Sequence, residues 1–326
     1  MSMLEELKEQ IRTALPDLDM VIAWEQGFDA AHGTPLFIRT EADVDRLMVG
    51  PLSVQNPATY LPALVKAKGA GKIGVVAKGC DSRAIVELLQ EKLISREQVV
   101  IFGFGCNGCV SQALLEGKIE EAGKYSAELT GVETDGRTVK AQVAGETLSF
   151  DFNDVTFEKC LTCEYPNTLI ADHFVGDKVE VAPGCEKAPS LEEFEKLSQN
   201  EKLSFWQEQM RRCVRCYACR NACPMCVCRD HCIATTHDPQ WISQENNAQE
   251  NFMFQMIHTM HLAGRCVECG ECERACPVNL PLMLLRRTMG EAVRNVFDYT
   301  TGTDPEVVPP LMTFKVEEEN INERGW

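Results

Sequence analysis

A pattern of cysteines that occurs twice constrains the fold of this chain more than any other feature. Both copies read C-x2-C-x2-C-x3-C-P; the first runs from Cys213 to Pro224 and the second from Cys266 to Pro277. Three thiolates at this spacing can hold one corner of an iron-sulfur cube, and the displaced fourth thiolate ligates the other cube in two-cluster proteins. The pattern therefore predicts two 4Fe-4S clusters. The expected ligand sets are Cys213, Cys216, Cys219 and Cys276 for the first cluster, and Cys266, Cys269, Cys272 and Cys223 for the second.

A structural zinc site is the competing interpretation, because paired C-x2-C elements also make tetrahedral zinc sites. Such a site takes four ligands from two pairs. Each run here instead supplies three close cysteines and a fourth that stands directly before a proline. The spacing therefore favours iron-sulfur clusters over zinc.

Size and charge set the broad class of protein. The chain has 326 residues, enough for two domains, and a formal net charge of -17. Nucleic acid is not an expected partner, because binding it depends on Lys and Arg that neutralise phosphates. No apolar run reaches the roughly 20 residues of a membrane span, and the charged amino terminus is unlike a signal peptide. We expect a soluble, cytoplasmic chain whose 17 cysteines serve metals rather than disulfides.

The amino-terminal part alternates strands and helices. Ile73–Ala77 and Val99–Gly103 have the pattern of short buried strands, and helical spacing follows each of them, over 82–92 and from Ser111 onward. Two successive strand-helix units predict a parallel sheet, in which sites form at the carboxyl ends of the strands. Residues 131–158 alternate polar and apolar side chains around turn signals, which predicts an antiparallel hairpin or meander. We therefore expect an α/β amino-terminal domain with a small parallel sheet and an added β-hairpin.

Cysteines also gather in this amino-terminal part. Cys80 and Cys106 each follow one of the two strands, so we expect them to meet at the same edge of the sheet. Cys160 and Cys163 form a further C-x2-C after the predicted hairpin. Together these residues supply four thiolates, enough for a third 4Fe-4S cluster. The alternatives for any of these ligands are Cys109 and Cys185.

Four short segments follow one another in this part: Lys78-Gly79-Cys80-Asp81, Cys106-Asn107-Gly108, Cys160-Leu161-Thr162-Cys163, and Ala171-Asp172 with Gly176-Asp177. Their succession resembles the beta subunits of deazaflavin-dependent hydrogenases and dehydrogenases, a family that includes formate dehydrogenase beta subunits. The resemblance covers roughly residues 20–185. It implies that Cys80, Cys106, Cys160 and Cys163 hold a 4Fe-4S cluster next to a flavin site. Within the last segment, His173 and Asp172 either orient a cofactor or serve the packing of the fold.

The resemblance supports a flavin on this chain less strongly than it supports the cluster. Members of the family that bind FAD have a glycine-rich segment near the amino terminus, and nothing in residues 1–50 resembles it. Gly103, Gly105 and Gly108 do satisfy the dinucleotide fingerprint G-x-G-x-x-G, but their loop holds two cysteines and no single acidic residue stands out after a following strand. FAD is therefore kept for the alternative interpretation, in which this chain is itself a flavoenzyme.

The carboxy-terminal region is expected to be mainly α-helical. Cys223 and Cys266 are separated by 42 residues, which include a helical pattern at 250–262, and a shorter helix is expected at 280–287. This layout resembles the helical dicluster ferredoxin domains of succinate dehydrogenase and heterodisulfide reductase iron-sulfur subunits. The expected divisions are an iron-sulfur domain at 1–185, a linker at 186–205, a dicluster 4Fe-4S ferredoxin domain at 206–298, and an extended tail at 299–326 that docks on another subunit.

Several residues of this region keep more than one interpretation. Cys226, Cys228 and Cys232 follow the first motif and either bind another metal, replace a predicted ligand or remain buried thiols. His258 and His261 lie one helical turn apart and either bind a metal or have a structural role. Arginines surround the first motif and glutamates the second, which predicts a higher potential for the first cluster, because reduction adds negative charge.

Clusters of this kind exchange single electrons, and no catalytic constellation accompanies them. The chain has no H-E-x-x-H, nucleophile elbow or Walker loop. We expect a non-catalytic electron-transfer subunit of an anaerobic oxidoreductase complex of the formate dehydrogenase, hydrogenase or heterodisulfide reductase type. It would relay electrons between a catalytic subunit and a flavoprotein or ferredoxin partner. The alternative is an FAD-containing subunit that itself oxidises or reduces a deazaflavin or nicotinamide coenzyme.

Overall fold

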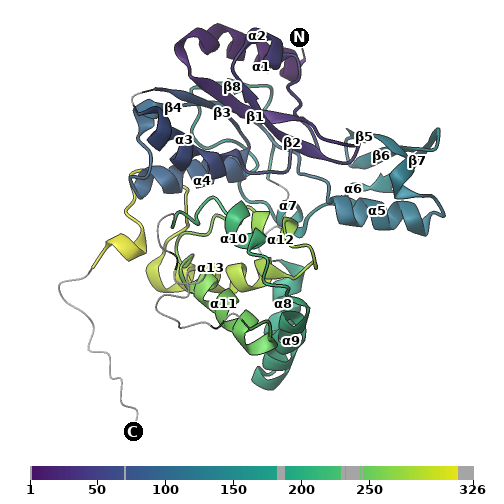
Figure 1. The fold of residues 1–326 in the computed structure, drawn as a ribbon, viewed down its shortest axis with the longest axis vertical. Helices are drawn as coiled ribbons and strands as arrows, with labels where there is room; N and C mark the ends of the chain where they lie inside the picture. The colour runs from purple at the N-terminus through teal and green to yellow at the C-terminus, as the bar shows by residue number, and fades with distance from the viewer. Residues whose placement is uncertain are drawn as a thin grey trace.

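The computed structural model describes residues 2–69, 71–181, 188–228, 232, 243 and 245–314. Figure 1 shows a larger sheet with its helices, a smaller sheet to one side of it, and a helical region beneath. The larger sheet and the helical region share a buried core, in which Val267 and Cys269 of the second cysteine motif pack with Ile85 and Leu88. The two halves of the chain therefore form one continuous structure in which sites can lie at the boundary.

The larger sheet has five strands in the order β2-β1-β3-β4-β8. These are β1 (Met20–Gln26), β2 (Gly33–Ile38), β3 (Ile73–Ala77), β4 (Val99–Phe104) and β8 (His173–Val175). Strands β1, β3, β4 and β8 run parallel, and β2 pairs antiparallel with β1 at the edge. Every residue of β3 is buried, as expected when both faces of a sheet are covered. The predicted parallel sheet is confirmed, with one antiparallel strand added.

Helices cover the two faces of this sheet. α1 (Met3–Ala14) packs on one face together with α2 (Glu41–Val44), and α3 (Leu61–Lys68) and α4 (Gly79–Gln90) pack on the other. α4 begins at Gly79, directly after β3 and earlier than the predicted start at Ser82. The reason is Asp81, whose carboxylate accepts the backbone N–H of Lys78 at 2.9 Å and closes the first turn. Cys80 therefore lies in the first turn of a helix.

The smaller sheet is a meander of three antiparallel strands, one of the two arrangements predicted for this segment. Its strands are β5 (Leu129–Asp135), β6 (Thr138–Val143) and β7 (Glu146–Asp151). Gly136 and Gly145 have φ angles of 60° and 81°, so each turn contains a residue in the left-handed region. The sheet packs against α5 (Gln112–Glu121) and α6 (Phe152–Val155) through its own small core.

The carboxy-terminal region is helical, as predicted. Its helices are α8 (Pro189–Glu195), α9 (Gln199–Arg212), α10 (Ala218–Ala222), α11 (Ala248–Met260), α12 (Glu271–Arg274) and α13 (Leu282–Phe297). α11 is the helix expected between the two motifs, and α13 extends well beyond the expected 280–287. Helices α8 and α9 occupy most of the segment assigned to a linker, and Phe194 packs on Trp206 there. Across the described ranges, no helix is long and apolar enough to cross a membrane.

After α13 the chain returns to α4. Arg83 donates two hydrogen bonds to the carbonyl of Thr301, at 3.1 and 2.8 Å, and Gln90 donates one to the carbonyl of Asp304 at 2.8 Å. The beginning of the predicted tail is therefore bound to the amino-terminal domain. Further on, Phe314 is 87% exposed, and the docking of the tail on another subunit stays a prediction. Residues 315–326, which include Trp326, lie outside the described residues.

Glu87 on α4 is buried where this returning segment covers the helix. The Tyr299 hydroxyl donates a hydrogen bond to Glu87 Oε2 at 3.1 Å. Burial, with Glu91 nearby, raises the pKa of Glu87 to about 7, whereas an unfolded glutamate titrates at about 4.3. The folded state therefore holds the proton more tightly, and stability falls as the pH rises between these two pKa values.

This shift predicts a pH dependence that one substitution removes. The native protein should lose about 2 kcal/mol of unfolding free energy between about pH 5.5 and about pH 8. Glu87→Gln cannot ionise and should lose much less. Denaturant unfolding of both proteins at the two pH values provides the measurement, and equal losses would contradict the assignment.

Candidate iron-sulfur sites

The two cysteine motifs fold in the same way. Each motif has two residues with a left-handed backbone. In the first motif they are Arg215 (φ 52°) and Tyr217 (φ 60°), and at the same two positions of the second motif they are Glu268 (φ 57°) and Gly270 (φ 73°). Each motif then enters a short helix, α10 or α12, that carries its third cysteine. Left-handed residues within a turn direct successive N–H groups to one side and create a concavity that suits an anion. A cube held by four thiolates is such an anion.

Each predicted ligand set surrounds a small cavity of its own. The first ferredoxin pocket is lined by Cys213, Cys216, Cys219 and Cys276. The second ferredoxin pocket is lined by Cys223, Cys266, Cys269 and Cys272. In each, one cysteine comes from the other motif, as the displaced fourth position predicts. The structure thus brings together the residues expected to share a cluster, while ligation itself stays a prediction.

Polar donors without partners line both ferredoxin pockets. Within the described part of the chain, Arg215 Nε and Nη2 at the first pocket and Arg286 Nε at the second are buried with no hydrogen-bond acceptor. Gln255 Nε2 donates to Cys219 Sγ at 3.6 Å. A buried donor left unpaired costs about 1–3 kcal/mol, and the sulfur atoms of a cluster would accept these N–H groups. Both pockets therefore fit an anionic cluster.

The thiols of the second ferredoxin pocket favour their protonated form. Burial raises the pKa of Cys266 and of Cys272 to about 12. Burial also raises the pKa of Cys269 well above its usual range. Because metal ligands must be thiolates, loading a cluster here has to release protons.

A larger cavity of about 510 Å³ lies where the larger sheet meets the helical region. Strands β3 and β4 are adjacent and pair Ala77 with Gly103, so their carboxyl ends open to the same place. The short helix α7 (Glu158–Leu161) closes another side. We call this cavity the amino-terminal pocket. The cysteines that line it are Cys80, Cys106, Cys109, Cys160 and Cys163.

Cys109 differs from its neighbours in the way its sulfur is oriented. Backbone N–H groups donate to the sulfurs of Cys106 and Cys160, each at 3.4 Å, as they would to thiolate ligands. Cys109 Sγ instead donates to the carbonyl of Ser53 at 3.7 Å, as a protonated thiol does. The Cys109 sulfur also makes side-chain hydrogen bonds with Cys106 and Cys160, so the choice of four ligands among the five cysteines stays a prediction. Cys185, the other alternative, lies outside the described residues.

The Lys78 and Asp81 side chains of the first family-like segment form a buried ion pair. Their charged atoms are 2.9 Å apart, and the two side chains are 2% and 0% exposed. Lys78 Nζ also lies 3.9 Å from the ring centroid of Trp24. The pair fixes the first turn of α4 and hence the position of Cys80.

Asp172 and His173 serve the packing of the fold, one of their two expected roles. Asp172 pairs with Arg96 at 2.7 Å and accepts the backbone N–H of Ile101 at 2.7 Å. The His173 ring stacks on Phe102 with centroids 5.1 Å apart. Neither residue lines the amino-terminal pocket.

The glycines of the G-x-G-x-x-G match also serve close packing. A Cβ at Gly103 would lie 2.7 Å from the Cβ of Thr168, and one at Gly105 would lie 2.7 Å from the carbonyl oxygen of Asp177. Thr168 precedes β8 and Asp177 follows it, so the segments on both sides of β8 lie directly against these two glycines. Close packing of the backbone therefore explains the glycines at these two positions without a bound nucleotide.

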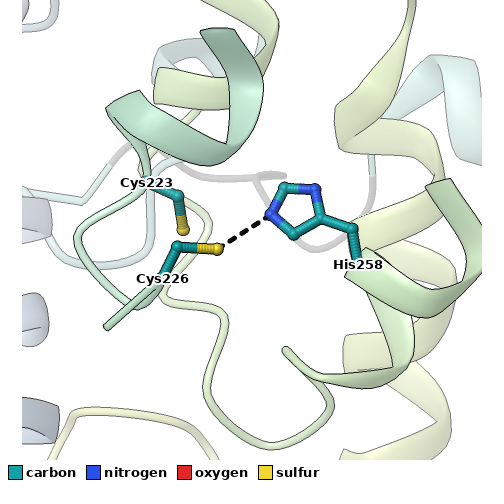
Figure 2. A group of neighbouring side chains, drawn as sticks. All are labelled: Cys223, Cys226 and His258. Atoms are coloured by element: carbon teal, nitrogen blue, oxygen red, sulfur yellow. Dashed lines mark hydrogen bonds between the residues drawn. The ribbon is translucent and has the colours of Figure 1, made fainter. Parts of the chain in front are cut away.

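The three extra cysteines have separate environments. Cys226 Sγ lies 3.0 Å from His258 Nε2, as Figure 2 shows. Cys228 is exposed, and Cys232 is buried in the core around the first ferredoxin pocket. Among the described residues, the group close enough to hold a metal ion is Cys223, Cys226 and His258. The structure thus brings His258 to these cysteines, a contact that its spacing to His261 does not suggest.

Lys159 is a candidate functional residue that the sequence motifs do not mark. It lines the amino-terminal pocket, and its Nζ donates to the carbonyl of Cys269 in the second ferredoxin pocket. Burial acts to lower the pKa of Lys159, but the combined negative charge of the sulfurs of Cys80, Cys160, Cys109 and Cys269 outweighs this effect and raises the pKa well above its usual range. Gly270 leaves room for the contact, because a Cβ there would lie 2.6 Å from Lys159 Cδ. The two pockets are therefore neighbours joined by one cation.

Known proteins resemble the chain in its cysteine region and along most of its length. A family model described as a 4Fe-4S dicluster domain matches residues 209–280. The chain is 26% identical to the F420-dependent formate dehydrogenase subunit beta of Methanocaldococcus jannaschii, over 92% of this chain and 90% of the relative. It is 25% identical to the F420-dependent formate dehydrogenase 1 subunit beta of Methanococcus maripaludis, over 90% and 89%.

A chain in the solved structure of the F420-reducing NiFe hydrogenase complex of Methanosarcina barkeri also matches this chain. It is 17% identical, with a TM-score of 0.41, and covers 65% of this chain and 90% of that one. The two curated relatives confirm the predicted resemblance to formate dehydrogenase beta subunits. The dicluster match and the names of these relatives are consistent with the predicted iron-sulfur electron-transfer subunit.

Proposed function

We propose that this chain is the electron-transfer subunit of an F420-dependent formate dehydrogenase or related hydrogenase complex, and that it carries three 4Fe-4S clusters in series. The ferredoxin pockets would hold two of them and the amino-terminal pocket the third, through Cys80, Cys106, Cys160 and Cys163. The single observation that carries this proposal is the contact of Lys159 with Cys269, which joins the amino-terminal pocket to the second ferredoxin pocket.

The neighbourhood of the pockets supports a linear relay. Cys219 of the first ferredoxin pocket and Cys272 of the second belong to one buried core. Cys269 of the second pocket and Cys80 of the amino-terminal pocket pack in another. Cys216 is exposed, so the first pocket offers an edge at which a partner subunit can exchange electrons. The expected order is the first ferredoxin pocket, the second, and then the amino-terminal pocket.

A second candidate function is supported by the size and charge of the amino-terminal pocket. At about 510 Å³ the cavity falls within the range of small-molecule sites, about 300–1,000 Å³. Arg83, Arg137 and Arg287 also line it, and they would suit the phosphates of a nucleotide cofactor. The alternative is thus a flavoenzyme that binds FAD here and exchanges electrons with a deazaflavin.

Three measurements on the anaerobically purified protein test these functions. A conduit should show cluster signals in electron paramagnetic resonance after reduction, release no stoichiometric FAD on denaturation, and fail to reduce coenzyme F420 without its partner subunits. About one FAD per chain, together with F420 reduction by the isolated chain, would establish the alternative. Absence of cluster signals from the reduced protein would reject the conduit.

A further inference from the structure

His258 and Cys226 meet beside the second ferredoxin pocket. The ligand atoms of Cys223, Cys226 and His258 all lie within 4.8 Å of one another. Figure 2 shows the Cys226 sulfur directed at the imidazole and the Cys223 sulfur beside it. Two thiols and an imidazole at such distances could supply three of the four ligands of a zinc site. The alternative is that the imidazole donates a hydrogen bond to Cys226.

The hydrogen-bond network distinguishes these alternatives. Arg286 Nη2 lies 2.6 Å from His258 Nδ1, and a guanidinium has only donors to offer. Nδ1 must therefore be the acceptor, which leaves the proton of the neutral imidazole on Nε2, the atom 3.0 Å from Cys226 Sγ. A metal bound at Nε2 would require the proton on Nδ1, facing the Arg286 donor. The network thus makes His258 a donor to sulfur and not a metal ligand.

Arg286 is held firmly in this position. It is 1% exposed, and its Nη1 donates to the Thr259 hydroxyl, which in turn donates to the carbonyl of Gln255 at 2.7 Å. Its Nε has no acceptor within the described part of the chain, and the side chain lines the second ferredoxin pocket. His258 is itself 4% exposed. Arg286 and His258 are thus a buried, hydrogen-bonded pair with one unused donor at the pocket. This arrangement is typical of residues that support a group bound beside them.

We propose that Arg286 and His258 act together as positioning residues that raise the reduction potential of the cluster in the second ferredoxin pocket. Arg286 acts through its unpaired Nε and its charge. His258 acts through the N–H that it donates to Cys226, whose sulfur lies within 4.8 Å of the Cys223 sulfur. Reduction adds one electron to the cluster, and no covalent bond of the protein forms or breaks. Donors to sulfur and nearby positive charge stabilise the more negative, reduced state. The inference rests on the proposed function, since it requires a cluster in this pocket.

Two substitutions at His258 separate hydrogen bonding from packing. In His258→Gln the side-chain amide keeps a donor near the position of Nε2, whereas His258→Leu removes it. The readout is the midpoint potential of the second cluster in an anaerobic titration followed by electron paramagnetic resonance, with iron and zinc per chain measured on the same samples. For His258→Leu we expect reduction to become about tenfold less favourable, which is a fall of about 59 mV for a one-electron couple. His258→Gln should remain close to the native potential.

Further outcomes decide the proposal even if one variant folds poorly. Cys226→Ala removes the sulfur that receives the His258 N–H, and it should lower the same potential while the iron content stays native. An unchanged potential in His258→Leu or in Cys226→Ala, at full iron content, would overturn the inference and leave the proposed function standing. Stoichiometric zinc in the native protein that is lost in both His258 variants would also overturn it. A native protein without a cluster in this pocket would reject the proposed function itself.

Discussion

Asp81→Ala is expected to lower the free energy of unfolding by about 3–5 kcal/mol, because it leaves the Lys78 ammonium buried without its counter-charge. The two side chains are 2% and 0% exposed and 2.9 Å apart, so water cannot replace the carboxylate. Asp81 also accepts the Lys78 backbone N–H and so starts α4. The variant should therefore weaken the position of Cys80 and lose iron from the amino-terminal pocket first. Denaturant unfolding followed by circular dichroism measures the stability.

Two controls isolate the effect of the uncompensated charge. Asp135 pairs with Lys140 at 2.8 Å, but both side chains are exposed, so Asp135→Ala should be close to neutral. The double variant Lys78→Met with Asp81→Leu removes both charges and should be more stable than Asp81→Ala alone. A single variant within about 1 kcal/mol of the native protein would show that the ion pair does not have the role assigned to it.

Gly79→Ala is expected to cost about 3 kcal/mol by overpacking. A Cβ at this position would collide with the carbonyl oxygen of Tyr165 and lie 3.0 Å from the carbonyl oxygen of Asn167. Both neighbours are backbone atoms, and the segment to which they belong follows Cys163. The strain therefore falls on the amino-terminal pocket, and iron should again be lost from that pocket rather than from the ferredoxin pockets.

Gly117 supplies the matched control for this substitution. It lies in α5, and a Cβ there would meet no atom of the described residues within 4 Å. Gly117→Ala should be neutral or stabilise the protein by up to about 1 kcal/mol, because alanine restricts the unfolded chain. Similar stability losses in both variants would mean that the close approach at Gly79 is not the cause.

The cysteine sets at the ferredoxin pockets are largely readable from the sequence, because their spacing is a local property. The displaced cysteine of each motif predicts that Cys276 joins the first set and Cys223 the second, and the structure places them around those two cavities. Strand periodicity also predicts β3 and β4, and parallel pairing at their carboxyl ends brings Cys80 and Cys106 together.

Contacts between distant segments account for what the sequence does not predict. Lys159 meets Cys269 across the boundary between the larger sheet and the helical region, and no local pattern marks that residue. His258 meets Cys226 because α11 packs beside the loop after the first motif, whereas helical spacing suggested only a relation to His261.

The difference in charge between the surroundings of the two motifs depends on the partners of the charged residues. In the sequence, arginines lie near the first motif and glutamates near the second. In the structure Glu271 pairs with Arg274 at 2.8 Å, and Glu268 lies 3.6 Å from Arg287. Arg286 adds a buried cation at the second ferredoxin pocket. The charge contrast behind the predicted order of potentials is therefore smaller than the sequence suggests.

The number of clusters in this chain is the central claim, and iron per chain tests it most directly. Anaerobically purified native protein should contain about twelve irons and about twelve acid-labile sulfides, the sum for three four-iron cubes. The double variant Cys80→Ser with Cys160→Ser should retain about eight of each, because the ferredoxin pockets remain intact. About eight irons in the native protein, unchanged in the variant, would contradict a cluster in the amino-terminal pocket.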